Sequence, residues 1–146
     1  MKIKILYAED DTFAQEFKVK TLKECGFNVC LAEDGQKAWE EYQKGRYDVL
    51  LLDGNMPEMT GEEVMRLVRA TGDDIAIVMY SNLPDYTLLN EGADECIDKG
   101  NCYPKELEWR IKAAFRRSQE RKEWKRLEVP KTEERKTFWS RFRRNS

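Results

Sequence analysis

The chain has 146 residues, of which 40% are hydrophobic and 37% charged, enough for one apolar core beneath a heavily charged surface. No apolar run approaches the ~20 residues of a membrane-spanning helix, and residues 1–5 enter a strand pattern without a signal-peptide core, which predicts a cytoplasmic protein. The lack of histidine excludes an imidazole base, and the four cysteines lack zinc-ribbon spacing, so we interpret them as reduced, structural thiols.

The first expected elements alternate between strand and helix. Residues 3–8, 27–32 and 49–52 have strand patterns, and the uninterrupted apolar run 49–52 is typical of a strand buried on both faces. Asp11 or Thr12 should cap the first helix, whose apolar face we assign to Phe13, Phe17 and Leu22. A second helix, capped by Asp34, carries the apolar residues Ala38, Trp39 and Tyr42.

The same alternation continues through the second half. Gly61 opens a third helix with Val64, Leu67 and Val68 on one side, and residues 75–80 and 95–98 are the last two strands. Between these strands, Pro84 to Glu91 should form a short, weak helix. Pro104 begins a long helix with Leu107, Ile111, Ala114 and Phe115 inward. Five strands alternating with five helices predict a parallel α/β sheet covered on both faces.

Charge divides the chain unequally. Residues 1–104 carry 11 Lys and Arg against 21 Asp and Glu, a net charge of −10, whereas residues 105–146 carry 15 against 7, a net charge of +8. An acidic body with a basic C-terminal part predicts two functional units. We assign residues 1–118 to the folded domain and 119–146 to a basic, helical or flexible extension.

Four of the expected strands end on polar side chains. The carboxyl ends of parallel strands meet at one edge of a sheet, where open α/β folds place their chemistry. That edge should collect Glu9 and Asp10, then Asp53, Ser81 and Lys99. Each residue alone could be an ordinary turn or cap residue. Four strand ends that all deliver such groups favour a site.

Clustered carboxylates repel one another unless a hard divalent cation neutralises them, and oxygen ligands favour Mg²⁺, Mn²⁺ or Ca²⁺. A carboxylate beside such a cation can act as a nucleophile toward phosphorus and form an aspartyl phosphate. Lys99 would add a positive charge and Ser81 a hydroxyl donor. The residues therefore predict phosphoryl transfer onto Asp53.

Four segments resemble the receiver domain of the two-component response-regulator family. They are Ile5-Leu6-Tyr7-Ala8-Glu9-Asp10-Asp11, Leu51-Leu52-Asp53-Gly54-Asn55-Met56-Pro57-Glu58-Met59-Thr60-Gly61, Met79-Tyr80-Ser81 and Gly92-Ala93-Asp94-Glu95-Cys96-Ile97-Asp98-Lys99. They occur in family order and spacing over about residues 1–118. The resemblance implies a flavodoxin-like (β/α)5 fold with a five-stranded parallel sheet of order 2-1-3-4-5.

The resemblance also implies roles for individual residues. Asp53 would take a phosphoryl group from a sensor histidine kinase or histidine phosphotransfer protein. Mg²⁺ would be bound by Asp10, Asp53 and the backbone carbonyl of Asn55, with Glu9 acting through water. Ser81 and Lys99 would contact the phosphoryl group. Such a protein accepts phosphate and is not an enzyme, apart from limited autodephosphorylation.

The chain departs from the family pattern on the face where receivers signal. Cys96 stands where the family usually has Tyr or Phe, Asn82 where it has a small residue, and Gly100 where it has proline. Tyr86 is one of few apolar anchors of the shortened helix between the last two strands. We therefore expect phosphorylation to reshape this face, made of Asn82, Cys96 and Tyr86, by another route or hardly at all.

The basic extension has several interpretations. Its last part sets Phe138, Trp139 and Phe142 among basic residues, and it is too short for a winged-helix output domain. It could be a solvated segment that folds back on the acidic body or pairs with a second subunit. It could also be a membrane-surface helix, or, as the weakest interpretation, a nucleic-acid contact.

Three functions are consistent with the residues. The first is a stand-alone receiver in a phosphorelay, with an unknown downstream protein. The second is a receiver-fold module that docks to a partner or membrane through its basic aromatic tail without phosphate turnover. The third, a phosphohydrolase with an aspartyl intermediate, is disfavoured because Asn55 occupies the second position of the Asp-x-Asp acid pair typical of those enzymes.

Overall fold

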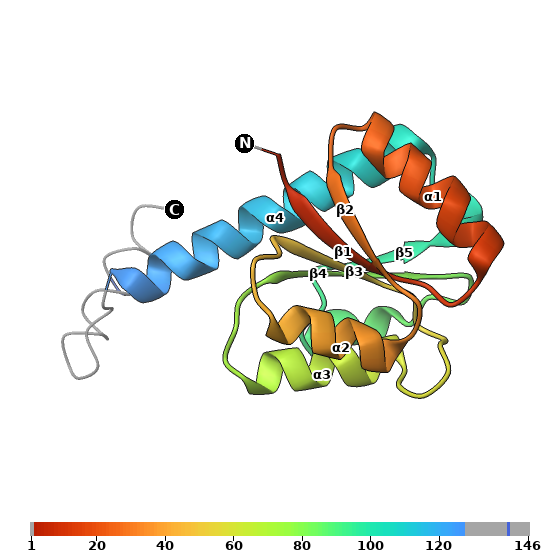
Figure 1. The fold of residues 1–146 in the computed structure, drawn as a ribbon. Coiled ribbons are helices and arrows are strands. Elements are labelled where there is room, and N and C mark those ends of the chain that lie inside the picture. The colour runs from red at the N-terminus through yellow and green to blue at the C-terminus, as the bar shows by residue number, and fades with distance from the viewer. Residues whose placement is uncertain (1, 128–139, 141–146) are drawn as a thin grey trace.

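A computed structural model describes residues 2–127 and Ser140 of the chain. Five strands form one parallel sheet in the order β2-β1-β3-β4-β5, as the sequence predicted (Figure 1). The strands are β1 (Lys4–Ala8), β2 (Asn28–Ala32), β3 (Val49–Leu52), β4 (Ala76–Ser81) and β5 (Glu95–Asp98). All four residues of β3, the central strand, are buried, because helices cover it on both sides.

Four α-helices in the described part of the chain cover the two faces of the sheet. They are α1 (Thr12–Glu24), α2 (Gly35–Gln43), α3 (Gly61–Ala70) and α4 (Pro104–Arg126). Helices α2 and α3 lie on one face, and α1 and α4 lie on the other (Figure 1). Two cores result: Leu50 and Val64 belong to the first, whereas Leu51 and Ile111 belong to the second.

The helix ends follow the local signals in the sequence. The side chain of Asp11 accepts hydrogen bonds from two backbone N–H groups of α1, and Asp34 caps α2 in the same way. Thr60 and Glu63 form a reciprocal capping box at the start of α3. Gly26 and Gly45, which follow α1 and α2, adopt positive φ angles of 93° and 77°.

Two predictions about apolar helix faces were wrong. Phe13 and Phe17 are 84% and 65% exposed, although Leu22 is fully buried as expected. The two rings share a face because they lie four residues apart, but the face of α1 that meets the sheet holds Gln15 instead. On α3, Val64 and Val68 are buried as expected, but Leu67 is 37% exposed and Met65 is buried in its place.

The segment between β4 and β5 was expected to be a short helix at residues 84–91. It forms only a 3₁₀-helix, η1 (Tyr86–Asn90), in which Leu88 is buried. A second 3₁₀ turn, η2 (Lys99–Asn101), follows β5. The segment of η1 is short and has few apolar side chains. It therefore lacks the repeated burial that stabilises an α-helix.

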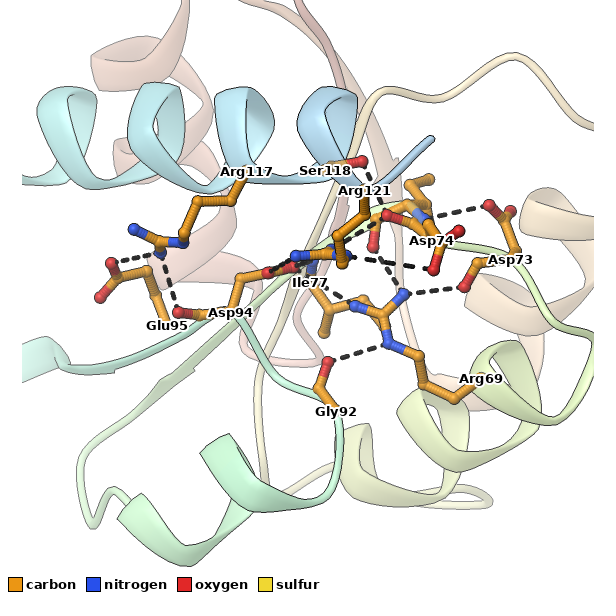
Figure 2. A network of polar contacts seen from close by, with 11 residues as sticks. Arg69, Asp73, Asp74, Ile77, Gly92, Asp94, Glu95, Arg117, Ser118 and Arg121 are labelled. Carbon is orange, nitrogen blue, oxygen red and sulfur yellow. Dashed lines mark hydrogen bonds and ion pairs between the residues drawn. The ribbon is translucent and has the colours of Figure 1, made fainter. Parts of the chain in front are cut away.

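Helix α4 is attached to the body by a polar network at the amino ends of β4 and β5 (Figure 2). Arg121 forms ion pairs with Asp94, at 2.6 Å, and Ser118 donates a hydrogen bond of 2.7 Å to the carbonyl oxygen of Asp74. Arg117 bridges to Glu95 at 2.7 Å. Helix α4 therefore continues without a break past residue 118, and residues before and after position 118 both contact the body. The proposed division at residues 118 and 119 stays a prediction.

Asp94 is the centre of this network. Its carboxylate, only 6% exposed, pairs with Arg121 of α4 and with Arg69 of α3, and it also accepts the backbone N–H of Ile77 in β4. Arg69 in turn donates to the carbonyl oxygens of Gly92, Asp73 and Ile75. One carboxylate thus joins two helices, which lie on opposite faces of the sheet, to a strand between them.

None of the described helices is long and apolar enough to cross a membrane. Phe138, Trp139 and Phe142, the expected interaction residues of the extension, lie outside the described residues.

We predict that Asp94→Asn lowers the free energy of unfolding by about 2 to 4 kcal/mol. The change removes the anion that Arg69 pairs with and leaves Arg121, among the described residues, with only one carboxylate, that of Asp74 at 4.0 Å. Urea denaturation followed by circular dichroism measures the change. Glu123→Gln is the matched control. Among the described residues Glu123 pairs with the exposed Arg126 alone, and its loss should cost at most about 0.5 kcal/mol. Equal stability of the two variants would contradict the assigned role of Asp94.

Candidate functional site

The register of the central strands brings two acidic residues together. In the parallel pairing of β1 with β3, Ala8 lies beside Leu52, so the next residues, Glu9 and Asp53, leave the sheet at the same edge. The backbone N–H of Asp53 donates to the carbonyl oxygen of Ala8 at 3.0 Å, which extends the pairing by one residue. The position of both carboxylates therefore follows from strand pairing rather than from a flexible loop.

Glu9, Asp10 and Asp53 form an acidic cluster. One carboxylate oxygen of each lies within 4.8 Å of those of the other two. Glu9 and Asp53 are 2% and 7% exposed, whereas Asp10 is open to solvent. Like charges at such separations are costly, and burial makes them more so. Within the described residues this is the group of side chains best suited to a hard cation.

Several contacts hold Glu9 in the cluster. The hydroxyl of Tyr7 donates to its carboxylate at 3.4 Å, the backbone N–H of Asp11 donates at 3.3 Å, and the Gln15 side chain donates to its carbonyl oxygen. Burial raises the pKa of Glu9, and the charge of Asp53 raises it further, whereas the hydrogen bond from Lys99 opposes both effects. Glu9 is therefore a buried carboxylate that needs positive charge nearby.

Lys99 supplies that charge from the end of β5. Its ammonium forms a short ion pair with Glu9 and lies 3.4 Å from the Asp53 carboxylate. Ser81, at the end of β4, lies beside the loop that follows β3, since a Cβ built on Gly54 would be 3.4 Å from the Ser81 hydroxyl oxygen. The backbone N–H of Asn55 donates to Asp53 at 3.2 Å. The structure thus brings together all the residues predicted for the metal and phosphoryl contacts.

Two glycines allow the loop after β3 to pack closely. A Cβ on Gly61 would lie 2.1 Å from the carbonyl oxygen of Asp53, and a Cβ on Gly35 would lie 1.8 Å from that of Met59. No real side chain tolerates such distances. The loop that carries Asp53 is therefore fixed against the first residues of both α2 and α3.

The donor set fits Mg²⁺. Three carboxylates with converging oxygens, one of them solvent-exposed, offer the hard ligands this ion prefers and leave room for water. The cluster itself contains only carboxylates and no soft thiolate ligand. Cys96, the buried cysteine, contacts the carbonyl oxygen of Asp85 instead.

Comparison with known proteins places this geometry in a family. The family model of the response regulator receiver domain matches residues 5–112. The chain belongs to the response regulator receiver family. Receivers of this family work in two-component systems, where they interact with sensor histidine kinases or phosphotransfer proteins.

Curated relatives and solved structures agree with this assignment. The chain is 36% identical over 120 residues to response regulator MprA of Mycobacterium leprae (strain TN) and 35% identical over 122 residues to MprA of Mycobacterium ulcerans (strain Agy99). These alignments cover 80% and 81% of the chain but 52% of each relative. The chain therefore spans about half the length of the curated relatives it matches.

Two solved structures illustrate the structural similarity. A CheY-like receiver domain protein from Methanospirillum hungatei JF-1 superposes with a TM-score of 0.75 at 22% identity, covering 83% of this chain and 99% of the other. Response regulator TrrA from Thermotoga maritima, solved in complex with Mg(2+)-BeF, gives a TM-score of 0.70 at 29% identity, covering 78% and 99%.

The receiver's expected signalling face consists of two exposed residues and one buried residue. Asn82 and Tyr86 are exposed, and Tyr86 belongs to the 3₁₀-helix η1. Cys96 is 2% exposed, and its thiol donates to the carbonyl oxygen of Asp85. Cys96 thus joins β5 to the segment that leads into η1, as a small buried side chain.

Sequence reasoning missed three residues near the receiver's acidic cluster. Tyr7 and Gln15 hold Glu9, and the buried ring of Tyr80 lies beneath Lys99, whose ammonium is 5.5 Å from the ring centroid. The period of a β-strand would have found Tyr7, which is two residues before Glu9 and points to the same face. Gln15 and Tyr80 give no such local signal.

We predict that Cys96 is the least reactive of the receiver's thiols. Burial raises the pKa of Cys96 to about 11. At about pH 8 such a thiol is ionised to roughly 0.1%, whereas an unperturbed one is ionised to about a quarter, so alkylation should be at least ~100-fold slower than for a free thiol. Peptide mass spectrometry after timed iodoacetamide treatment measures the rate. The control is the same reaction in denaturant, where the four cysteines should react alike.

Proposed function

We propose that this receiver accepts a phosphoryl group on Asp53, in a Mg²⁺-dependent reaction, from a phosphohistidine of a sensor histidine kinase or histidine phosphotransfer protein. The observation that supports this proposal most is the position of Asp53: it ends the central strand, beside Glu9 and Asp10 and 3.4 Å from the Lys99 ammonium. A carboxylate flanked by acids and one lysine is suited to attack a phosphoryl group once a cation offsets the charge.

The chemistry assigned to Asp53 is a single displacement. One of its carboxylate oxygens forms a bond to phosphorus, the nitrogen–phosphorus bond of the donor breaks, and the imidazole leaves with the electron pair. No side chain of this receiver has to act as a general base, because a carboxylate oxygen attacks through its own lone pair and has no proton to lose. The protein then carries the product and is an acceptor rather than an enzyme, apart from slow loss of the phosphoryl group to water.

Asp10 and Asp53, with the backbone carbonyl of Asn55, would hold Mg²⁺, and Glu9 would contact it through water. The ion supplies charge neutralisation between the acceptor carboxylate and the phosphoryl oxygens. Burial of Glu9 and Asp53 supports this role, since two desolvated carboxylates are held together at a cost that a cation would relieve. Mn²⁺ offers the same ligand preference as an alternative.

Lys99 and Ser81 would contact the phosphoryl oxygens. Lys99 pairs with Glu9 and lies near Asp53, so a small movement would carry its ammonium to a group attached to Asp53. The Ser81 hydroxyl oxygen accepts the backbone N–H of Leu83 at 3.2 Å, which leaves its own proton free to be donated. Both side chains stand on strand ends and are therefore positioned before phosphorylation.

A second candidate is a receiver-fold docking module without phosphate turnover. It is favoured by the altered signalling face, where Cys96 fills a buried position and the segment before β5 forms one 3₁₀-helix in place of an α-helix. The acceptor residues are nevertheless all together at the sheet edge, which favours the first candidate. The same phosphorylation assay separates the two.

We predict that acetyl phosphate with Mg²⁺ adds one phosphoryl group to the receiver and that Asp53→Asn abolishes the addition. Intact mass spectrometry detects the adduct, and removal of Mg²⁺ with a chelator should suppress it at least ~10-fold, because the repelling charges then stay uncompensated.

Asp34→Asn serves as the control for that assay. Asp34 also follows a strand at the same edge, but its side chain caps α2, and Asn caps a helix equally well. The control should be phosphorylated like the parent protein. An unmodified parent, or an adduct of equal yield on Asp53→Asn, would contradict the first candidate and favour the docking module.

A further inference from the structure

Lys18 is a half-buried cation close to the acceptor site. It lies on α1, and its ammonium is 5.2 Å from the centroid of the Tyr80 ring, which is itself 2% exposed. Within the described residues Lys18 forms no ion pair with a carboxylate. Cys25 and Cys102 would raise the pKa of Lys18 if their thiols were ionised. Burial raises the pKa of both thiols, so they stay uncharged at neutral pH.

Lys18 shares its ring with the lysine of the acceptor site. The ammonium of Lys99 lies 5.5 Å from the same Tyr80 centroid, so the two cations are separated by no more than the sum of these distances. Lys99 is offset by Glu9 and Asp53. The partners of Lys18 among the described residues are instead aromatic rings, that of Tyr80 and, at 5.8 Å, that of the exposed Phe17. The site therefore has two cations but only one with carboxylate partners.

A desolvated lysine without an anion destabilises the resting protein. Burial lowers the pKa of Lys18, and the charge of Lys99 lowers it further, which shows that the surroundings oppose its positive charge. At such a half-buried position beside an aromatic ring, an apolar side chain would avoid this cost. The charge becomes favourable when more negative charge arrives nearby, as it does when a phosphoryl group is attached to Asp53.

We infer that Lys18 is a second cationic positioning residue of the acceptor site, which acts across the Tyr80 ring to favour the phosphorylated state and to hold Lys99 toward the carboxylates. The inference rests on the proposed function. It assigns Lys18 no contact with the phosphoryl group, and it makes Tyr80 the neutral spacer between the two lysines.

The expected size of the effect follows from Coulomb's law. Unit charges about 10 Å apart, at an effective dielectric constant of about 20 to 40, change an equilibrium by roughly 4- to 16-fold. Partial exposure of Lys18 reduces this, so we expect a loss of about three- to tenfold in affinity for a phosphoryl analogue when its charge is removed. The loss should shrink as salt is added.

The test compares Mg²⁺-dependent binding of beryllofluoride, followed by fluorine NMR, in the parent protein and in Lys18→Met, Lys18→Arg and Lys20→Met. Lys18→Met should bind three- to tenfold more weakly in about 20 mM salt, where screening is weak, and close to parent affinity in about 500 mM salt. Lys18→Arg keeps the charge and should stay within about twofold of the parent. Lys20→Met makes the same change at an exposed position of α1 and should bind like the parent.

Thermal unfolding separates this role from a structural one. Lys18→Met should unfold at the same or a higher temperature than the parent, because it removes a desolvated cation, and Lys18→Gln is the second variant if Met packs poorly. Parent-like affinity of folded Lys18→Met or Lys18→Gln in low salt would overturn the inference and leave the proposed function standing. A parent protein that binds no beryllofluoride would overturn both.

Discussion

The close approach of Glu9 and Asp53 is the constraint on which the site depends. Parallel pairing of β1 with β3 fixes it, because Ala8 and Leu52 are neighbours and the next residue of each strand is acidic. Both carboxylates are buried, so their repulsion is weakly screened by water. Lys99, which reaches the pair from β5, is the positive charge that makes this arrangement tolerable in the described structure.

The two edges of the sheet differ in how completely their negative charges are balanced by positive ones. At the amino edge, Asp94 has two arginines and a backbone donor, so its charge is fully satisfied and serves to hold α3, α4 and β4 together (Figure 2). At the carboxyl edge, Lys99 pairs with Glu9 and Asp53, and Asp10 adds a third carboxylate, so negative charge remains in excess. The satisfied network holds these elements together, whereas the unsatisfied cluster is where we propose that a cation and a phosphoryl group bind.

Most of the fold could be predicted because strand and helix-end signals are local. The buried run 49–52 was predicted with its observed ends, and Asp11 and Asp34 cap helices as expected. The outward direction of Phe13 and Phe17 could not be predicted, since nothing in α1 itself shows that Gln15 is needed against the carbonyl oxygen of Glu9. The contact of Gln15 with Glu9, rather than the hydrophobicity of Phe13 and Phe17, determines which face of α1 meets the sheet.

The same limit applied to the site. Glu9, Asp10, Asp53, Ser81 and Lys99 stand at strand ends, so topology alone brings them to one edge. Lys18 and Tyr80 meet because the Lys18 side chain of α1 reaches the Tyr80 ring of β4, a tertiary contact that strand order does not specify. A lysine on a helix is normally read as a solvent-exposed residue, and its burial became visible only in three dimensions.

The tight packing at Gly35 and Gly61 has a consequence for how the protein can vary. Neither glycine would touch an ion or a phosphoryl group, yet a methyl group at either would collide with the backbone of the loop that begins at Asp53. How well a position near this site tolerates substitution should therefore depend on how closely it packs against this loop, rather than on its distance from the reacting atoms. A scan of substitutions should find that Gly35 and Gly61, the first residues of α2 and α3, do not tolerate a side chain, although neither is expected to be a ligand.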